Sequence, residues 1–68
     1  MQNKNMRKAI TEVIRQRKLL TKRRHELRLS LRQLARLSGV SAPTINRFEN
    51  GKEIELTNFV SLFGVLQR

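Results

Sequence analysis

Residues 29–51 read LSLRQLARLSGVSAPTINRFENG, and this stretch decides the fold. Ser30 and Ser41 each stand where a helix can begin, because a serine hydroxyl accepts a hydrogen bond from an amide in the first helical turn. Gly39 lies between them and suits the left-handed turn that ends a helix. The Asn-Gly pair at the end of the stretch is a strong stop signal. The stretch therefore predicts two short helices joined by a tight turn.

The apolar residues of this stretch fall at helical spacing, with polar residues between them. We expect the following to face a core: Leu34, Ala35, Val40, Ile45 and Phe48. Pro43 fits the first turn of the second helix, where no intrahelical donor is needed. Two helices in this layout form a helix-turn-helix, whose second helix is shaped to enter a DNA major groove.

The charge of the chain agrees with an anionic partner. Fifteen Lys and Arg residues against five Asp and Glu give a net charge of +10 on 68 residues. Nucleic acid, an anionic membrane surface and an acidic protein are the usual partners of such a chain. All but three of the basic residues precede Gly39. We therefore interpret the first half as the electrostatic part of the molecule.

Several function classes find no support in the composition. Cysteine is absent and His25 is the single histidine, so we expect no metal site, no cofactor and no enzymatic activity. No apolar run approaches the roughly 20 residues that span a bilayer, and the first residues lack the apolar core of a signal peptide. We therefore expect a cytoplasmic protein.

The flanking segments complete an all-α fold, a small bundle of four helices. One long helix is expected over about 7–27, and a break near Thr21 would make five. The last helix is expected over about 56–66. Its expected core side chains are Leu56, Phe59, Leu62, Phe63 and Leu66, and Leu27 is expected in the core as well. We divide the chain into a basic, helical N-terminal extension (1–19) and a helix-turn-helix domain (20–68).

A set of residues carries a family resemblance: Ser30, Leu34-Ala35, Gly39-Val40-Ser41, Thr44-Ile45, Arg47 to Gly51 and the closing apolar helix. On these residues, 30–66 resembles the Cro/repressor-type domain, also called the Xre family. The segments 46–50 and 56–59 are similar to DNA-binding antitoxins of the HipB kind. The resemblance implies a lambda-repressor-like fold and duplex DNA as the partner.

The sequence departs from the family in two places. Leu31 stands where members often have a glutamine that touches DNA phosphate. Members also usually continue into an element that forms a dimer, whereas this sequence stops at Arg68. A homodimer would then form through other surfaces, such as the extension; the alternative is a monomer without DNA.

Residues of the second motif helix that lie off its buried side are candidates for reading bases. Arg47 can bond a guanine through two donors, and Asn46 can pair with an adenine in the same way. Contact of Arg47 with a phosphate is the alternative. The candidate base readers are Ser41, Ala42, Pro43, Thr44, Asn46 and Arg47.

Polar and basic residues around the motif are candidates for the DNA backbone. They are Lys22, Arg23, Arg28, Arg32, Arg36, Asn50 and Lys52. A merely solvated charged face is the alternative for the group. By the resemblance, the start of the first motif helix and the region of Asn50 and Lys52 lie closest to phosphate. It also implies a structural ion pair between Arg24 and Glu49, which would clamp the first helix to the reading helix.

The chain is therefore interpreted as a sequence-specific DNA-binding transcription regulator, a repressor that acts by occupying its operator. The alternative is an antitoxin-like protein that neutralises a partner toxin and autoregulates its operon. The apolar row of the N-terminal extension leaves three readings open: packing on its own domain, pairing with another copy, or docking a partner protein. A membrane-surface helix fits the composition too but leaves the turn motif unexplained.

Overall fold

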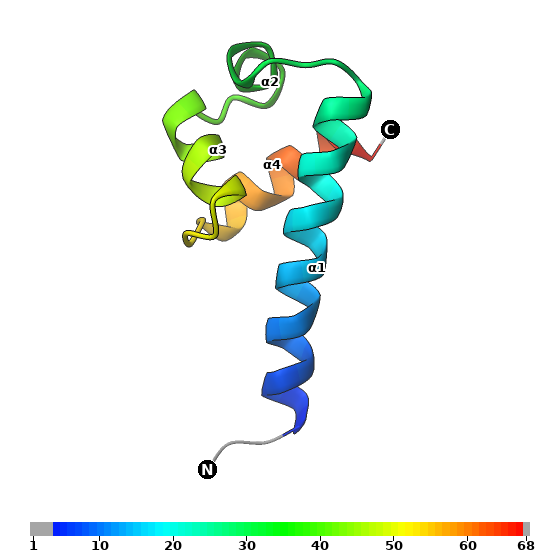
Figure 1. Cartoon of the computed structure of the whole chain (residues 1–68). Coiled ribbons are helices and arrows are strands. Elements are labelled where there is room, and N and C mark those ends of the chain that lie inside the picture. The colour runs from blue at the N-terminus through cyan, green and yellow to red at the C-terminus, as the bar shows by residue number, and fades with distance from the viewer. Residues whose placement is uncertain (1–3, 68) are drawn as a thin grey trace.

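The computed structural model describes residues 4–67, which form four helices. Helix α1 spans Lys4–Glu26, α2 spans Leu31–Ser38, α3 spans Ala42–Glu49 and α4 spans Leu56–Leu66. The three short helices gather around the C-terminal half of α1, and the N-terminal half projects away from them (Figure 1). The shape is accordingly elongated, with extents of 42 × 20 × 19 Å. The expected all-α bundle with a helix-turn-helix is confirmed.

Both motif helices begin at the expected serines. The Ser30 hydroxyl accepts a hydrogen bond from the Gln33 amide (3.0 Å), and the Gln33 side chain accepts one from the Ser30 amide (2.8 Å). This reciprocal pair satisfies two donors that the first turn leaves open. Gly39 ends α2 at φ 78°, a conformation that favours glycine because it has no Cβ. The turn between α2 and α3 is therefore specified locally.

The core lies where α2, α3 and α4 meet the C-terminal half of α1. The buried side chains of this core are Leu20, Leu34, Val40, Ile45, Phe48, Leu62 and Leu66. Phe48 and Phe59 add an edge-to-face ring contact, with centroids 6.0 Å apart. Both buried residues of α3 belong to this core, so the core fixes which side of α3 faces outward.

Three expected core residues are exposed instead. Leu56 is 75% exposed, Phe63 41% and Leu27 41%. Helix α4 packs through Leu62 and Leu66, which turns Leu56 and Phe63 outward. Leu27 follows the end of α1, and the half-buried Leu29 packs against the core.

The expected single long helix is confirmed, and the alternative of a break near Thr21 is not, because α1 continues without interruption to Glu26. No glycine or proline interrupts this segment, and the adjacent Leu20 anchors it in the core. The division of the chain after residue 19 therefore falls inside a continuous helix. Residues 1–3 of the expected extension lie outside the described residues.

Candidate nucleic-acid interface

Helix α3 presents a polar side to solvent. Ile45 and Phe48 are 1% exposed and hold the helix on the core. Asn46 and Arg47, beside them in sequence, are exposed. At the start of the helix, Ser41 and Pro43 are exposed as well, while Ala42 and Thr44 are half-buried. All six candidate base readers thus belong to one helix and its cap, and the four exposed ones are accessible to a ligand.

Hydrogen bonds order the first turn of α3. The Ser41 hydroxyl accepts a hydrogen bond from the Thr44 amide at 3.3 Å and donates one to the Thr44 hydroxyl at 2.8 Å. This leaves the Thr44 hydroxyl proton able to donate to a ligand. Pro43 needs no intrahelical partner at its position. The N-terminal end of α3 is therefore set before any ligand arrives.

The far end of α3 is closed by Asn50. Its side-chain amide donates to the Asn46 carbonyl at 2.7 Å and to the Asn46 side-chain oxygen at 3.1 Å. The second contact fixes the Asn46 amide with its NH₂ group available as a donor. The Asn46 side-chain oxygen retains one further lone pair, so the two-point pairing of Asn46 with adenine stays chemically possible.

Arg24 holds the end of α3 from the side of α1. Its Nε lies 2.7 Å from Glu49 Oε2, and its Nη2 lies 2.9 Å from Glu49 Oε1. A third donor of the same guanidinium reaches the Leu29 carbonyl at 2.8 Å. The hydrogen bonds to Glu49 raise the pKa of Arg24 above its ordinary value. One side chain thus ties α3 both to α1 and to the segment before α2.

Arg17 is a second anchor, which the sequence analysis did not identify. Its Nε donates to the Phe48 carbonyl at 2.8 Å, and its guanidinium carbon lies 5.4 Å from the centre of the Phe48 ring. A cation at the last carbonyls of a helix is favourable because partial negative charge collects there. Arg17 precedes Arg24 by two helical turns, and that spacing was the signal in the sequence that could have suggested a second anchor.

The candidate phosphate-binding residues lie in different parts of the fold. Arg32 and Arg36 are exposed one turn apart on α2, and Asn50 and Lys52 are exposed at the end of α3. Lys22 is exposed on α1. These residues belong to the motif or to surfaces next to it.

Arg28 and Arg23 have special environments. Arg28 is exposed after α1 in a left-handed conformation, with φ 58°. Arg23 is half-buried and directed toward α4, where its Nε donates to the Leu66 carbonyl at 3.1 Å. Its Nη1 also lies 3.6 Å from Glu26 Oε1. The guanidinium of Arg23 therefore has protein partners away from α3.

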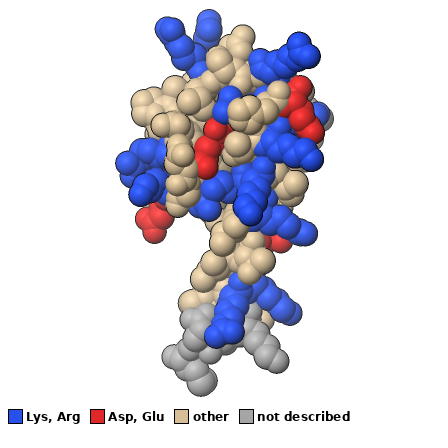
Figure 2. Space-filling view, in the orientation of Figure 1, with Lys and Arg blue, Asp and Glu red and all other residues tan. Residues whose placement is uncertain are grey.

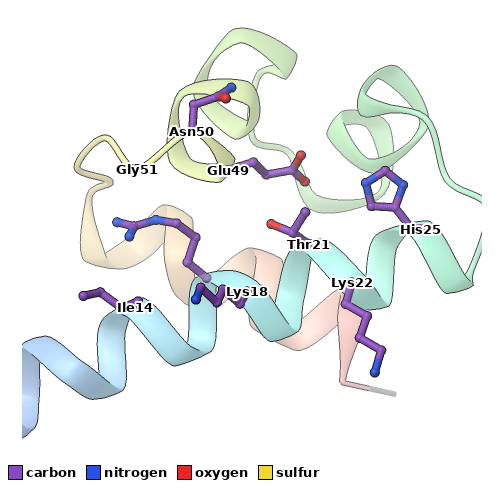
Figure 3. Close-up of a pocket in the computed structure, with 9 residues that line it drawn as sticks. Ile14, Lys18, Thr21, Lys22, His25, Glu49, Asn50 and Gly51 are labelled. Atoms are coloured by element: carbon purple, nitrogen blue, oxygen red, sulfur yellow. The ribbon is translucent and has the colours of Figure 1, made fainter.

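A groove separates α1 from the end of α3 (Figure 3). From α1 it is lined by Lys18, Lys22 and His25 among others, and from α3 and the following turn by Glu49, Asn50 and Gly51. Among residues 4–67, no cluster of metal-ligating side chains occurs. Within residues 4–67, no helical segment combines the length and the apolar composition of a membrane span.

Comparison with known proteins gives one match. A family model described as helix-turn-helix matches residues 19–68, which include all of α2, α3 and α4 and the last turns of α1. No curated protein and no solved structure matches. The match supports the resemblance to Xre-type domains, and most of the N-terminal extension lies outside it.

Proposed function

This chain belongs to the helix-turn-helix family, and on that premise we propose that it binds duplex DNA at a preferred sequence and represses transcription by occupying its operator. The family supports DNA binding and transcription regulation in general. The finer proposal rests on one observation. The core buries Ile45 and Phe48 and thereby leaves the polar side of α3, with Asn46 and Arg47, exposed to solvent.

In this proposal α3 enters the major groove and reads bases. Arg47 is the residue best suited to a guanine, because its guanidinium donates to O6 and N7 together. Asn46 suits an adenine, and the exposed Pro43 offers apolar surface to a thymine methyl. Ser41 and Thr44 contribute hydroxyls at the start of the helix.

Contacts with phosphate set the position of α3 in the groove. Arg32 and Arg36 supply them from α2, and Lys52 supplies one from the end of α3. Asn50 joins this set only after its side-chain amide leaves the two Asn46 oxygens to which it donates. Lys22 and Arg28 extend this set on the side of α1. Arg23 joins it only after leaving the Leu66 carbonyl, so we rank it last among the candidates.

The anchors of α3 give the proposed site its rigidity. Arg24 and Arg17 both hold the last turn of α3 against α1. A reading helix fixed before binding loses less conformational freedom when it binds. We therefore assign Arg24, Glu49 and Arg17 to positioning of α3 and not to contact with bases.

Selection of bound duplexes from a random pool tests the proposed function. We expect enrichment of a short preferred sequence, because the exposed side of α3 carries chemically distinct groups. Equal recovery of all sequences would contradict the proposal and would favour a nonspecific, architectural DNA-binding protein. A repressor also lowers transcription from a promoter that carries the selected site.

A second candidate function is an antitoxin-like protein, and one observation favours it. The projecting part of α1 exposes apolar side chains, with Met6, Ile10 and Val13 each more than half exposed. Such side chains suit a protein partner. Co-purification with the product of a neighbouring reading frame would distinguish this function from that of a simple repressor.

A further inference from the structure

One side of α1 carries a long row of six residues, all of them basic except Thr11. Its members are Lys8, Thr11, Arg15, Lys18, Lys22 and His25. They follow one another at intervals of three or four residues, and this spacing keeps them on the same side of a helix. All six are exposed. We call this set the basic row; Thr11 is its one member without a basic group.

The basic row begins beside the candidate interface. Lys18, Lys22 and His25 line the groove whose other wall includes Asn50 and Gly51 (Figure 3). Glu49 also lines this groove, but Arg24 binds its carboxylate through two hydrogen bonds. The negative charge of Glu49 in this groove is therefore already paired.

From this groove the basic row continues along the projecting part of α1. Figure 2 shows Lys and Arg side chains both on the packed end of the molecule and along the projecting helix. The distance from Lys8 to Lys22 is roughly 21 Å, since an α-helix rises about 1.5 Å per residue. One DNA strand places about six phosphates over that length. The row thus matches a stretch of backbone and not a single anion.

We infer that the basic row binds the phosphate backbone of the same duplex that α3 reads, and so lengthens the contact past the C-terminal end of α3. This inference rests on the proposed function. The members from Lys8 to Lys18 precede the residues that match the family, so membership of the family does not account for them.

The two sides of α1 favour DNA over a membrane as the partner of this row. Met6, Ile10 and Val13 follow a separate helical spacing, which leads to the buried Leu20. A bilayer that took up these apolar residues would lie against the same side of α1 as the packed domain. A duplex against the groove instead meets Lys18, Lys22 and His25 of the basic row, and the end of α3.

The N-terminal part of the row provides the test. Arg15 has an ion pair with Glu12 at 3.1 Å, but both side chains are largely exposed, so Arg15 can exchange this partner for a phosphate. We compare the full chain without substitutions with the full-length double variant Lys8→Gln/Arg15→Gln. The matched control is Lys8→Arg/Arg15→Lys, which keeps both charges. Circular dichroism checks that the three proteins have the same helix content.

Affinities are measured on two duplexes at several salt concentrations. Both carry the selected sequence; one ends at its boundaries, and the other adds a helical turn of arbitrary sequence on each side. We expect the full chain to bind the longer duplex more tightly and with a steeper salt dependence. Loss of two contacts should lower the salt slope on the longer duplex by about 1.8, and affinity by roughly fivefold to tenfold per contact at 0.1 M salt. The charge-keeping control should behave like the full chain.

A variant that adds a phosphate contact provides a second experiment. Thr11→Lys fills the one gap in the basic row and should raise the salt slope on the longer duplex by about 0.9. The shorter duplex should be bound by every variant as the full chain binds it.

The possible failures are distinguishable. Equal binding of both duplexes by the full chain, or an unchanged slope in Lys8→Gln/Arg15→Gln, would overturn the inference and leave the proposed function intact. Absence of any selected sequence would remove the proposed function and this inference with it. Charge-dependent binding to vesicles of anionic lipid, with DNA binding unaffected by the variants, would assign the row to a membrane surface.

Discussion

Arg24 and Glu49 are 25 positions apart, yet they bind each other through two hydrogen bonds of 2.7 and 2.9 Å. The pair joins α1 to the last residue of α3. Both side chains are close to nine-tenths buried, so each charge depends on the other for compensation. The orientation of α3 relative to α1 therefore depends on this pair.

Breaking the pair should destabilise the fold. We expect Arg24→Ala or Glu49→Ala to lower the free energy of unfolding by about 2 kcal/mol, because each leaves a shielded charge with fewer partners. Chemical denaturation of both single variants and the double variant measures the coupling between the two residues.

The pair between Arg15 and Glu12 serves as the matched control. Its side chains are 68% and 49% exposed, and exposed pairs contribute little. The same cycle on these residues should give a much smaller coupling. Equal couplings for the two pairs would show that shielding from solvent does not strengthen the pair at the end of α3.

Arg17 should also stabilise α3. Arg17→Ala removes a hydrogen bond to the Phe48 carbonyl and a cation above the Phe48 ring. We expect a loss of about 1–2 kcal/mol in the free energy of unfolding. Lys18→Ala, next to it on the exposed side of α1, should change stability by less than about 0.5 kcal/mol. Similar losses for both would argue against a specific role of Arg17.

Local signals in the sequence predicted the motif well. Ser30, Gly39 and Ser41 act through neighbours within a few residues, so their roles follow from chemical type and position. The outward side of α3 was predictable for a related reason. The spacing of Ile45 and Phe48 determines which side is buried, and Asn46 and Arg47 must then lie off it.

Long-range packing explains what the sequence did not predict. Leu56 and Phe63 fit an apolar spacing on α4, but only the position of α1 and α2 decides which residues of that spacing become buried. Arg17 is one of many basic residues before Gly39. Its partner, a backbone carbonyl 31 positions away, leaves no trace in side-chain types. Only its position two helical turns before Arg24 sets Arg17 apart in the sequence, and that spacing does not identify its partner.

Arg28 occupies a backbone conformation that suits glycine. Its φ of 58° is unfavourable for a residue with a Cβ, by roughly 1 kcal/mol. Arg28→Gly should therefore raise the free energy of unfolding by about 0.5–1 kcal/mol. Arg36→Gly removes the same side chain from within α2 and should lower it by about 1 kcal/mol. Thermal unfolding of the two variants compares the signs directly, and a decrease for both would contradict strain at Arg28.

Acid should weaken the projecting part of α1. The hydrogen bond from Gln16, with the nearby charge of Arg15, lowers the pKa of Glu12 below its ordinary value of 4.5. A pKa that is lower in the helix than in the unfolded chain means that these contacts stabilise the helix above pH 4.5. The stabilisation is lost as pH falls through the lowered pKa. Helix content measured by circular dichroism should fall further with acid in the natural chain than in Glu12→Gln. Identical acid profiles would remove Glu12 as a cause.

Base reading by the exposed side of α3 is tested by comparing two variants, Arg47→Ala and Arg32→Ala. Arg47→Ala should weaken binding to the selected duplex by about 1–3 kcal/mol, because two donors to one guanine are lost, and should leave a scrambled duplex nearly unaffected. Arg32→Ala should weaken binding to both duplexes by the same factor and should lower the salt slope of binding by about 0.9.

The most direct measurement is the ratio of affinities for the selected and scrambled duplexes, determined for the natural chain and for Arg47→Ala at one salt concentration. We expect this ratio to fall at least fivefold in Arg47→Ala and to stay unchanged in Arg32→Ala. A ratio that Arg47→Ala leaves unchanged, with both affinities reduced equally, would contradict base reading by Arg47 and make it a phosphate contact.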